Sequence, residues 1–325
     1  MLGALLALIS SATFAFNNTA TRRGVLTGSV IQAMAITVPL GVVLFGIAAW
    51  LAGSLGMVTQ FSWSAIGFFS LAGFMHFVFG RYCNYRAIAA IGTNLSSPIQ
   101  QWEVLVTLAL ALIFLRESLG PIQIFAIALL VLGPALAARV DNKPPAATKP
   151  RSTFVPRYAE GYLFAFLTIF GYGSSPILIK AGLHHGGIGD SLAAGVVSYA
   201  FATAVVVFAA IALRQVGHVM SVAAEPARWF AVAGVLVFLS HMFRYMALAL
   251  VPVTVVAPIM RIQSLFRIYF SWLLTREHEV FESSVILGTL VSLAGAVLLS
   301  LDSGLVASVL PLPEAIKSAL GWRWP

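Results

Sequence analysis

Apolar stretches of about 20 residues, separated by short polar or turn-rich breaks, follow one another along most of the chain. A helix needs about 20 mostly apolar residues to cross the hydrocarbon core of a membrane. The stretches lack the polar–apolar alternation that is typical of a membrane β-strand. The pattern therefore predicts an all-α integral membrane protein. Ten transmembrane helices are expected, at residues 2–20, 30–52, 65–88, 93–115, 121–138, 161–179, 192–213, 229–250, 253–275 and 284–301.

The second half of the chain repeats the first. Residues 85–117 read YRAIAAIGTNLSSPIQQWEVLVTLALALIFLRE, and residues 245–277 read YMALALVPVTVVAPIMRIQSLFRIYFSWLLTRE. The constant offset of 160 places Pro98 opposite Pro258, and both segments close on Arg-Glu. Each half holds five predicted helices, and because five is an odd number the second half must enter the membrane inverted. Inverted repeats with a substrate site between them are a common design of secondary transporters.

The chain therefore divides into two repeats, a linker and a tail. Residues 1–138 form the first five-helix repeat and residues 161–303 the second. Residues 139–160 carry four prolines and several charges, which is typical of a polar linker. Residues 304–325 are expected to form an interfacial or disordered tail, because Trp322 and Trp324 suit a membrane–water interface.

Composition agrees with a lipid environment. The chain is 60% hydrophobic and only 9% charged, whereas soluble domains carry about 25% charged residues. The net charge of +8 comes largely from basic residues at helix ends and in the linker, where lipid headgroups are the expected partner. Nucleic acid is therefore not an expected partner. A single cysteine, Cys83, excludes an intrachain disulfide and a CxxC metal site, and no cofactor or metal is expected.

The predicted helices resemble a known family. Two five-helix halves, whose fourth and ninth helices carry a proline and end in Leu-Arg-Glu and Thr-Arg-Glu, resemble the EamA type of the drug/metabolite transporter superfamily. The resemblance covers residues 1–301 and does not specify the substrate. It implies a multi-pass transporter of a bacterial-type cytoplasmic (inner) membrane that exports metabolites, and not an enzyme. The family also implies cytoplasmic termini, whereas the basic linker favours the reverse orientation, so orientation stays open.

Ionisable side chains inside a membrane helix are costly and mark a transport pathway. Glu103 lies near the middle of the fourth predicted helix, and Gln263 is its counterpart in the second half. A buried carboxylate can bind and release a proton during transport. Glu103 is therefore the candidate for proton coupling, and the alternative is a static ion pair with an arginine. Arg81 is expected near the depth of Gln100, within reach of Glu103, because the third and fourth helices form a hairpin.

Arginines outnumber carboxylates within the predicted helices, and arginine binds carboxylate and phosphate with two parallel hydrogen bonds. The substrate is therefore expected to be anionic or zwitterionic. Pro98 and Pro258 are predicted to break their helices and free a carbonyl, although each can also be a simple packing kink. Nine residues are predicted to bind the substrate, with packing or interhelical hydrogen bonding as the alternative: Arg81, Glu103, Arg244, Arg261, Gln101, Gln263, Asn17, Tyr245 and His241.

The sequence thus predicts a secondary transporter, an exporter, of a small-molecule substrate such as an amino acid or organic acid, working by alternating access. The first alternative is a proton-coupled exporter of cationic drugs with Glu103 as the counter-charge. The second is a non-transport membrane protein, but the sequence contains no recognisable nucleophile–base set, phosphate loop or metal cluster. The small residues Gly288, Ser292 and Ala296 fit a close helix contact, either within the bundle or across a homodimer.

Overall fold

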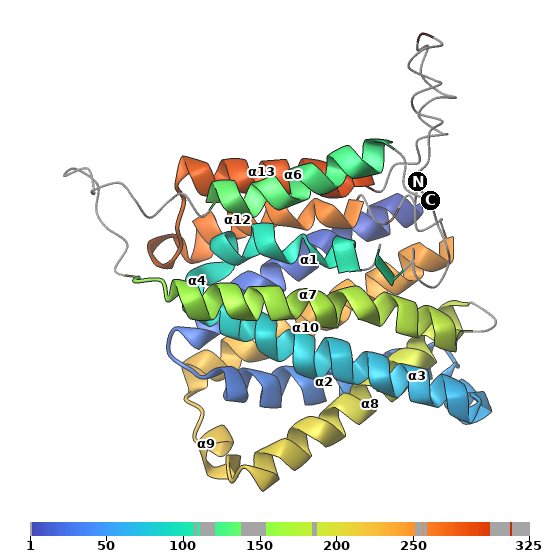
Figure 1. Cartoon of the computed structure of the whole chain (residues 1–325). Coiled ribbons are helices and arrows are strands. Elements are labelled where there is room, and N and C mark those ends of the chain that lie inside the picture. The colour runs from blue at the N-terminus through green and yellow to red at the C-terminus, as the bar shows by residue number, and fades with distance from the viewer. Residues whose placement is uncertain are drawn as a thin grey trace.

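The computed structural model describes residues 2–106, 109–110, 121–137, 154–183, 187–250, 256, 259–299 and 313. All regular structure in this part of the chain is helical (Figure 1). The first half contains α1 (Leu2–Val25), α2 (Val30–Leu51), η1 (Leu55–Gln60), α3 (Trp63–Gly73), η2 (Phe74–Gly80), α4 (Arg81–Gln100) and α6 (Pro121–Ala137). The second half contains α7 (Tyr158–Gly182), α8 (Ile188–Ala212), α9 (Val216–Met220), α10 (Ala224–Leu250), α12 (Gln263–Leu274), η4 (Arg276–His278) and α13 (Ser283–Leu299).

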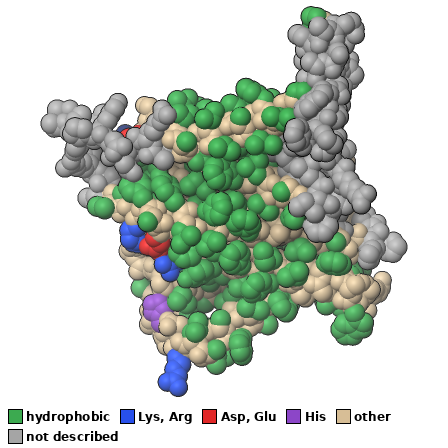
Figure 2. Space-filling model, viewed as in Figure 1, with side chains coloured by type: hydrophobic (Ala, Val, Ile, Leu, Met, Phe, Trp, Pro, Cys, Tyr) green, Lys and Arg blue, Asp and Glu red, His purple; other side chains and the backbone are tan. Residues whose placement is uncertain are grey.

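Six of the described helical segments are long and apolar enough to cross a membrane, and the segments Pro121–Ala137 and Ser283–Leu298 are shorter apolar helices. Hydrophobic side chains cover most of the face shown in Figure 2, and charged side chains lie at its left and lower edges. Large apolar side chains such as Trp63, Phe208 and Trp50 are more than two-thirds exposed. Water is a poor solvent for such a surface, so lipid surrounds the bundle. The count of ten helices remains a prediction, because parts of the fourth and ninth lie outside the described residues.

Local sequence signals begin several of these helices. Ser29 and Gln32 form a capping box at the start of α2, in which each side chain accepts a hydrogen bond from the other residue's amide N–H. Ser62 caps α3 by accepting from the amide N–H of Ala65 at 3.2 Å. These caps satisfy amides that have no partner inside the helix.

The predicted hairpin between the third and fourth helices is formed within α4. Gly92 has φ +80° and ψ 177°, a conformation that side-chain-bearing residues rarely adopt, and it reverses the chain there. The two arms then run side by side, since Gln100 Nε2 on the second arm donates to Asn84 Oδ1 on the first at 2.7 Å.

Helix α2 packs antiparallel on α8 through paired glycines and aromatic rings. A Cβ added to Gly41 would overlap the ring of Tyr199, and one added to Gly195 would overlap the ring of Phe45. Moving four residues forward on α2, from Gly41 to Phe45, corresponds to moving four residues back on α8, from Tyr199 to Gly195, so the two helices run in opposite directions. Each glycine lets the opposite ring approach the helix backbone closely.

Helices α6 and α13 also pack antiparallel, at the top of the view in Figure 1. A Cβ at Gly133 would overlap Ser292 Oγ, and one at Gly295 would lie 2.7 Å from the carbonyl oxygen of Ala126. The small-residue stripe of Gly288, Ser292 and Ala296 thus packs within the bundle, which is one of the two arrangements that the sequence allowed.

Candidate functional site

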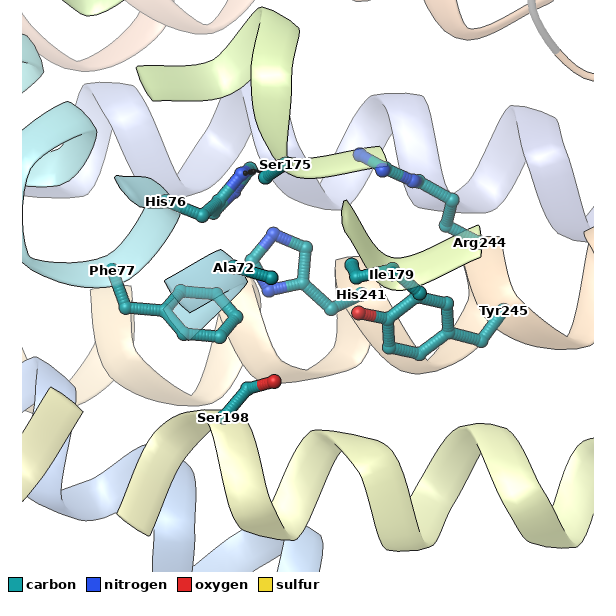
Figure 3. Close-up of a pocket in the computed structure, with 9 residues that line it drawn as sticks. All are labelled: Ala72, His76, Phe77, Ser175, Ile179, Ser198, His241, Arg244 and Tyr245. Atoms are coloured by element: carbon teal, nitrogen blue, oxygen red, sulfur yellow. Dashed lines mark hydrogen bonds between the residues drawn. The ribbon is translucent and has the colours of Figure 1, made fainter. Parts of the chain in front are cut away.

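A small cavity lies among α3, η2, α7, α8 and α10 (Figure 3). Its free space holds about one water molecule, so a metabolite fits only when these helices move apart. The π-helical segment η2 carries two of the lining residues, His76 and Phe77, and such segments occur often at functional sites. Among the described residues the polar lining is His76, Ser175, Ser198, His241, Arg244 and Tyr245, and the apolar lining is Ala72, Phe77 and Ile179.

Arg244 brings guanidinium donors to this cavity, and His241 brings an imidazole nitrogen, both from one face of α10. They are three residues apart, so their side chains are neighbours on the helix surface. Figure 3 shows the His241 ring in the middle of the cavity lining, with His76 and Arg244 on the same side of it. Within the described part of the chain, Arg244 is in none of the ion pairs and His241 Nε2 is buried without a hydrogen-bond partner.

Arg81 lies behind the cavity and is linked to it by Tyr199. Arg81 Nη2 donates to the Tyr199 hydroxyl at 2.8 Å, and this hydroxyl lies 3.1 Å from His241 Nδ1. The Arg81 guanidinium is also 5.0 Å from the ring centre of Phe77 and 5.4 Å from that of Tyr199. Aromatic faces attract a cation, so the buried charge of Arg81 is stabilised by its neighbours.

The helix that follows Gly92 is broken three residues after Pro98. The amide N–H of Trp102 donates to the carbonyl of Ile99 at 2.9 Å, and that of Leu105 donates to the carbonyl of Trp102 at 2.9 Å. Each of these bonds spans three residues in place of four, so the regular α-helical bonding is interrupted by a turn at residues 101–102.

The second half has the same break at the equivalent place. The amide N–H of Ile262 donates to the carbonyl of Ile259 at 3.1 Å, and that of Leu265 donates to the carbonyl of Ile262 at 2.9 Å. All three residues correspond to those of the first break at the offset of 160. Both halves therefore interrupt the same helix at the same point.

The two breaks are joined by side-chain contacts between the halves. Arg261 forms an ion pair with Glu103, and each side chain is 16% exposed. Gln101 donates through Nε2 to Ser264 Oγ. The arrangement neutralises the Glu103 carboxylate with a charge from the opposite half.

A buried chain of hydrogen bonds continues from this region into α1. Arg267 Nη1 donates to Gln100 Oε1 at 2.6 Å, and Gln100 in turn donates to Asn84. Asn84 Nδ2 donates to Asn18 Oδ1 at 3.0 Å. The Arg267 guanidinium lies 5.7 Å from the ring centre of Phe14, which also contacts the His241 ring. Phe14 thus lies between Arg267 and the cavity.

Glu279 is buried against the tip of the Gly92 hairpin. Its Oε1 accepts from the amide and the hydroxyl of Thr93 at 2.7 and 2.9 Å, and its Oε2 accepts from the amide of Asn94 at 3.1 Å. These amides begin the second arm, where a negative charge is favoured by the helix dipole. A Cβ at Gly92 would overlap the Glu279 carboxylate, so glycine is needed for space as well as for its positive φ.

Arg22 completes this contact from α1. Its Nε lies 3.7 Å from Glu279 Oε1, with side-chain exposures of 1% and 0%. Arg22 Nη1 donates to the carbonyl of Ile88 at 2.8 Å, at the end of the first arm, and Nη2 donates to the carbonyl of His278 at 2.6 Å. The two charges, which we call the Arg22–Glu279 lock, hold one end of the two halves together.

Comparison with known proteins identifies the protein family of this chain. The model of the EamA-like transporter family matches residues 1–139 and 159–301. The chain belongs to the EamA-like transporter family. Among solved structures, one crystal structure of a protein aligns over 92% of this chain and 98% of its own, with a TM-score of 0.58 and 14% identity, which shows the fold alone. No curated protein matches the sequence.

This EamA-like transporter is an integral, multi-pass membrane protein of the drug/metabolite type, as the sequence predicted. The structure brings three of its predicted site residues, His241, Arg244 and Tyr245, together at the cavity. Arg81 reaches them only through Tyr199. The ion pair that the structure shows at Glu103 is with Arg261, and Asn84 is the first-arm residue that bonds to Gln100.

The other predicted residues lie away from the cavity lining. Glu103, Arg261 and Gln101 meet at the helix breaks, and Gln263 is buried at the start of α12 beside them. Asn17 is 1% exposed, and its Oδ1 has no hydrogen-bond partner within the described residues. Pro98 lies inside α4 just before the first break. Pro258, the linker up to residue 153 and the tail except for Pro313 lie outside the described residues.

The sequence did not predict the Arg22–Glu279 lock in this EamA-like transporter. Arg22 follows the first predicted helix, which ends at residue 20, and Glu279 lies in a short polar connection with no periodic pattern. The one available signal was Gly92, which marked a tight turn. Its partner is not visible in the sequence, since Thr93 and Glu279 are 186 residues apart.

The titration of Glu279 gives a testable pH dependence. Burial raises the pKa of Glu279 above its ordinary value, and Arg22 with the amides of Thr93 and Asn94 only partly opposes this. The folded protein then holds a proton more tightly than the unfolded chain, so the free energy of unfolding falls as the pH rises above about 4.5. We expect Glu279→Gln to lose this part of the pH slope in thermal melts recorded at increasing pH above about 4.5. A Gln variant with the wild-type slope would contradict the prediction.

Proposed function

We propose that this EamA-like transporter moves a small anionic or zwitterionic metabolite, such as an amino acid or organic acid, out of the cell by alternating access. The observation that carries the proposal is the cavity at Arg244 and His241. Both residues line it, His241 Nε2 is buried there without a partner, and among the described residues no aspartate or glutamate lines it. A guanidinium in a water-poor site attracts an anion strongly and binds carboxylate through two hydrogen bonds.

The proposed architecture is ten membrane helices in two inverted five-helix repeats. The antiparallel packing of α2 on α8 and of α6 on α13 supports it, because each pair consists of equivalent helices from the two halves. Equivalent helices that meet antiparallel are related by a twofold axis perpendicular to them, which inverts one repeat. Parallel repeats would bring equivalent helices together in the same direction.

The proposed transport cycle is a rocking of the halves about the helix breaks. The Arg22–Glu279 lock holds one end of the halves closed. The breaks after Pro98 and at Ile262 lack part of the regular helix bonding, which supplies a bending point in each half. Separation of Arg22 from Glu279 would expose the cavity to one side of the membrane. The Arg22–Glu279 lock would form again before the cavity opens to the other side.

Glu103 is our candidate for proton coupling in this cycle. In the closed arrangement its charge is matched by Arg261 from the other half. When the halves separate, the carboxylate would leave this partner. We expect Glu103→Gln to abolish the pH dependence of transport in proteoliposomes. Unchanged pH-driven accumulation by the variant would make the pair purely structural.

Transport from loaded proteoliposomes tests the substrate class. The vesicles carry a mixture of labelled amino acids and organic acids, and protein-dependent loss of each label is followed. We expect loss of at least one labelled compound, with inhibition by unlabelled organic carboxylates and none by quaternary ammonium compounds. Inhibition by the ammonium compounds alone would favour the rival function, a proton-coupled exporter of cationic drugs.

A further inference from the structure

The hydrogen bonds behind the cavity have a fixed direction. Arginine has only donors, so Arg81 donates and the Tyr199 oxygen accepts at 2.8 Å. Tyr199 is fully buried, and within the described residues its hydroxyl contacts only Arg81 and His241 Nδ1. The hydroxyl hydrogen therefore has one acceptor available, which is His241 Nδ1 at 3.1 Å. If His241 Nδ1 instead donated to the Tyr199 oxygen, the buried hydroxyl hydrogen of Tyr199 would have no acceptor.

We infer that Arg81 and Tyr199 fix His241 as the neutral tautomer with its proton on Nε2, so that the cavity presents a permanent N–H donor to a substrate oxygen. This inference rests on the proposed function and states how the same site recognises its substrate. A neutral imidazole that accepts at one nitrogen carries its hydrogen on the other. His241 Nε2 is the buried atom that has no partner within the described residues.

The surroundings of His241 oppose a second proton on its ring. A hydrogen on Nδ1 would face the Tyr199 hydroxyl hydrogen, and the added positive charge would lie among arginines. No carboxylate is among the described groups that face it. The titratable and charged groups around the ring among the described residues are His76 from η2, Arg81 from α4, Tyr199 from α8, and Arg244 and Tyr245 from α10.

The fixed tautomer selects the chemistry of the ligand. A carboxylate oxygen accepts from His241 Nε2–H while Arg244 supplies the counter-charge. A quaternary ammonium group offers no acceptor to Nε2–H and is repelled by Arg244. Arg81 and Tyr199 do not line the cavity, so they are positioning residues that act through His241.

Nitrogen NMR of ¹⁵N-histidine-labelled protein in detergent tests the tautomer, with His241 assigned by its loss in His241→Gln. In wild type we expect an unprotonated Nδ1 and a protonated Nε2, both unchanged between about pH 5 and 8. Tyr199→Phe keeps the ring and removes the hydroxyl, so its His241 signals should show both tautomers and titrate in that range. Tyr245→Phe is the matched control, since it removes a cavity hydroxyl that makes no bond to His241, and it should match wild type.

The wild-type spectrum decides the inference even if Tyr199→Phe fails to fold. A protonated Nδ1, or a His241 ring that titrates between about pH 5 and 8 in wild type, would overturn it. Acetate and tetramethylammonium then serve as probes, and acetate alone should shift the Nε2 signal. A fixed tautomer that acetate does not perturb would support the positioning by Arg81 and Tyr199 and contradict the proposed anion site.

Discussion

Replacing Arg244 by glutamine is expected to weaken binding of the transported anion about 10- to 150-fold. A hydrogen bond to a charged group contributes about 1.5–3 kcal/mol, and each 1.4 kcal/mol corresponds to a tenfold change in affinity. Glutamine keeps a polar side chain in the cavity but removes the positive charge and the two-pronged donor. The concentration dependence of transport in proteoliposomes measures the effect, which should be a rise in KM.

The matched control for this variant is Arg86→Gln. Arg86 lies on the same bundle but pairs with Glu160, with side chains 35% and 25% exposed, and it does not line the cavity. Its replacement removes the same charge from a partly hydrated place and should leave KM within about twofold, since exposed ion pairs contribute about 0–1 kcal/mol. Equal effects of the two variants would show that Arg244 acts only through the net charge of the protein.

Replacing Glu279 by alanine is expected to lower the free energy of unfolding by about 3–5 kcal/mol. The change leaves the Arg22 guanidinium buried without its counter-charge. It also removes the acceptor of the Thr93 and Asn94 amides at the hairpin tip. Unfolding of the purified protein in mixed micelles, followed by helix content as denaturant is added, measures the loss.

Glu160→Ala is the matched control for the lock. Glu160 also pairs with arginines, Arg86 and Arg157, but these pairs are partly exposed and should contribute no more than about 1 kcal/mol. We expect a clear difference in stability between the two alanine variants. Similar stabilities would mean that the Arg22–Glu279 contact does not hold the halves together.

The features that local sequence determines were predictable. The hairpin was predictable because only a few residues separate the third and fourth predicted helices, and Gly92 supplies the positive φ of the turn. The repeat carried the family resemblance, and the same offset of 160 reappears in the backbone bonds around Trp102 and Ile262. Arg244 and His241, which line the cavity, stood out in the sequence because polar groups inside an apolar helix are costly without a role.

The pairing of side chains from distant segments was not predictable. Helical spacing fixes the face of a residue only relative to its own helix, so the rotation and register between helices stay unknown. A shift of three residues in the hairpin register moved Asn84, in place of Arg81, opposite Gln100. The Arg22–Glu279 lock depends on three segments meeting at one point, and no single segment shows it.

A thermal-shift titration of the purified transporter tests the anionic site most directly. Wild type and Arg244→Gln are melted in detergent with increasing concentrations of organic carboxylates, amino acids and quaternary ammonium compounds, since a ligand that binds the folded state raises the melting temperature. We expect stabilisation of wild type by at least one carboxylate or amino acid, and loss of that stabilisation in Arg244→Gln. Stabilisation of both proteins by quaternary ammonium compounds, with no response to any carboxylate, would contradict it.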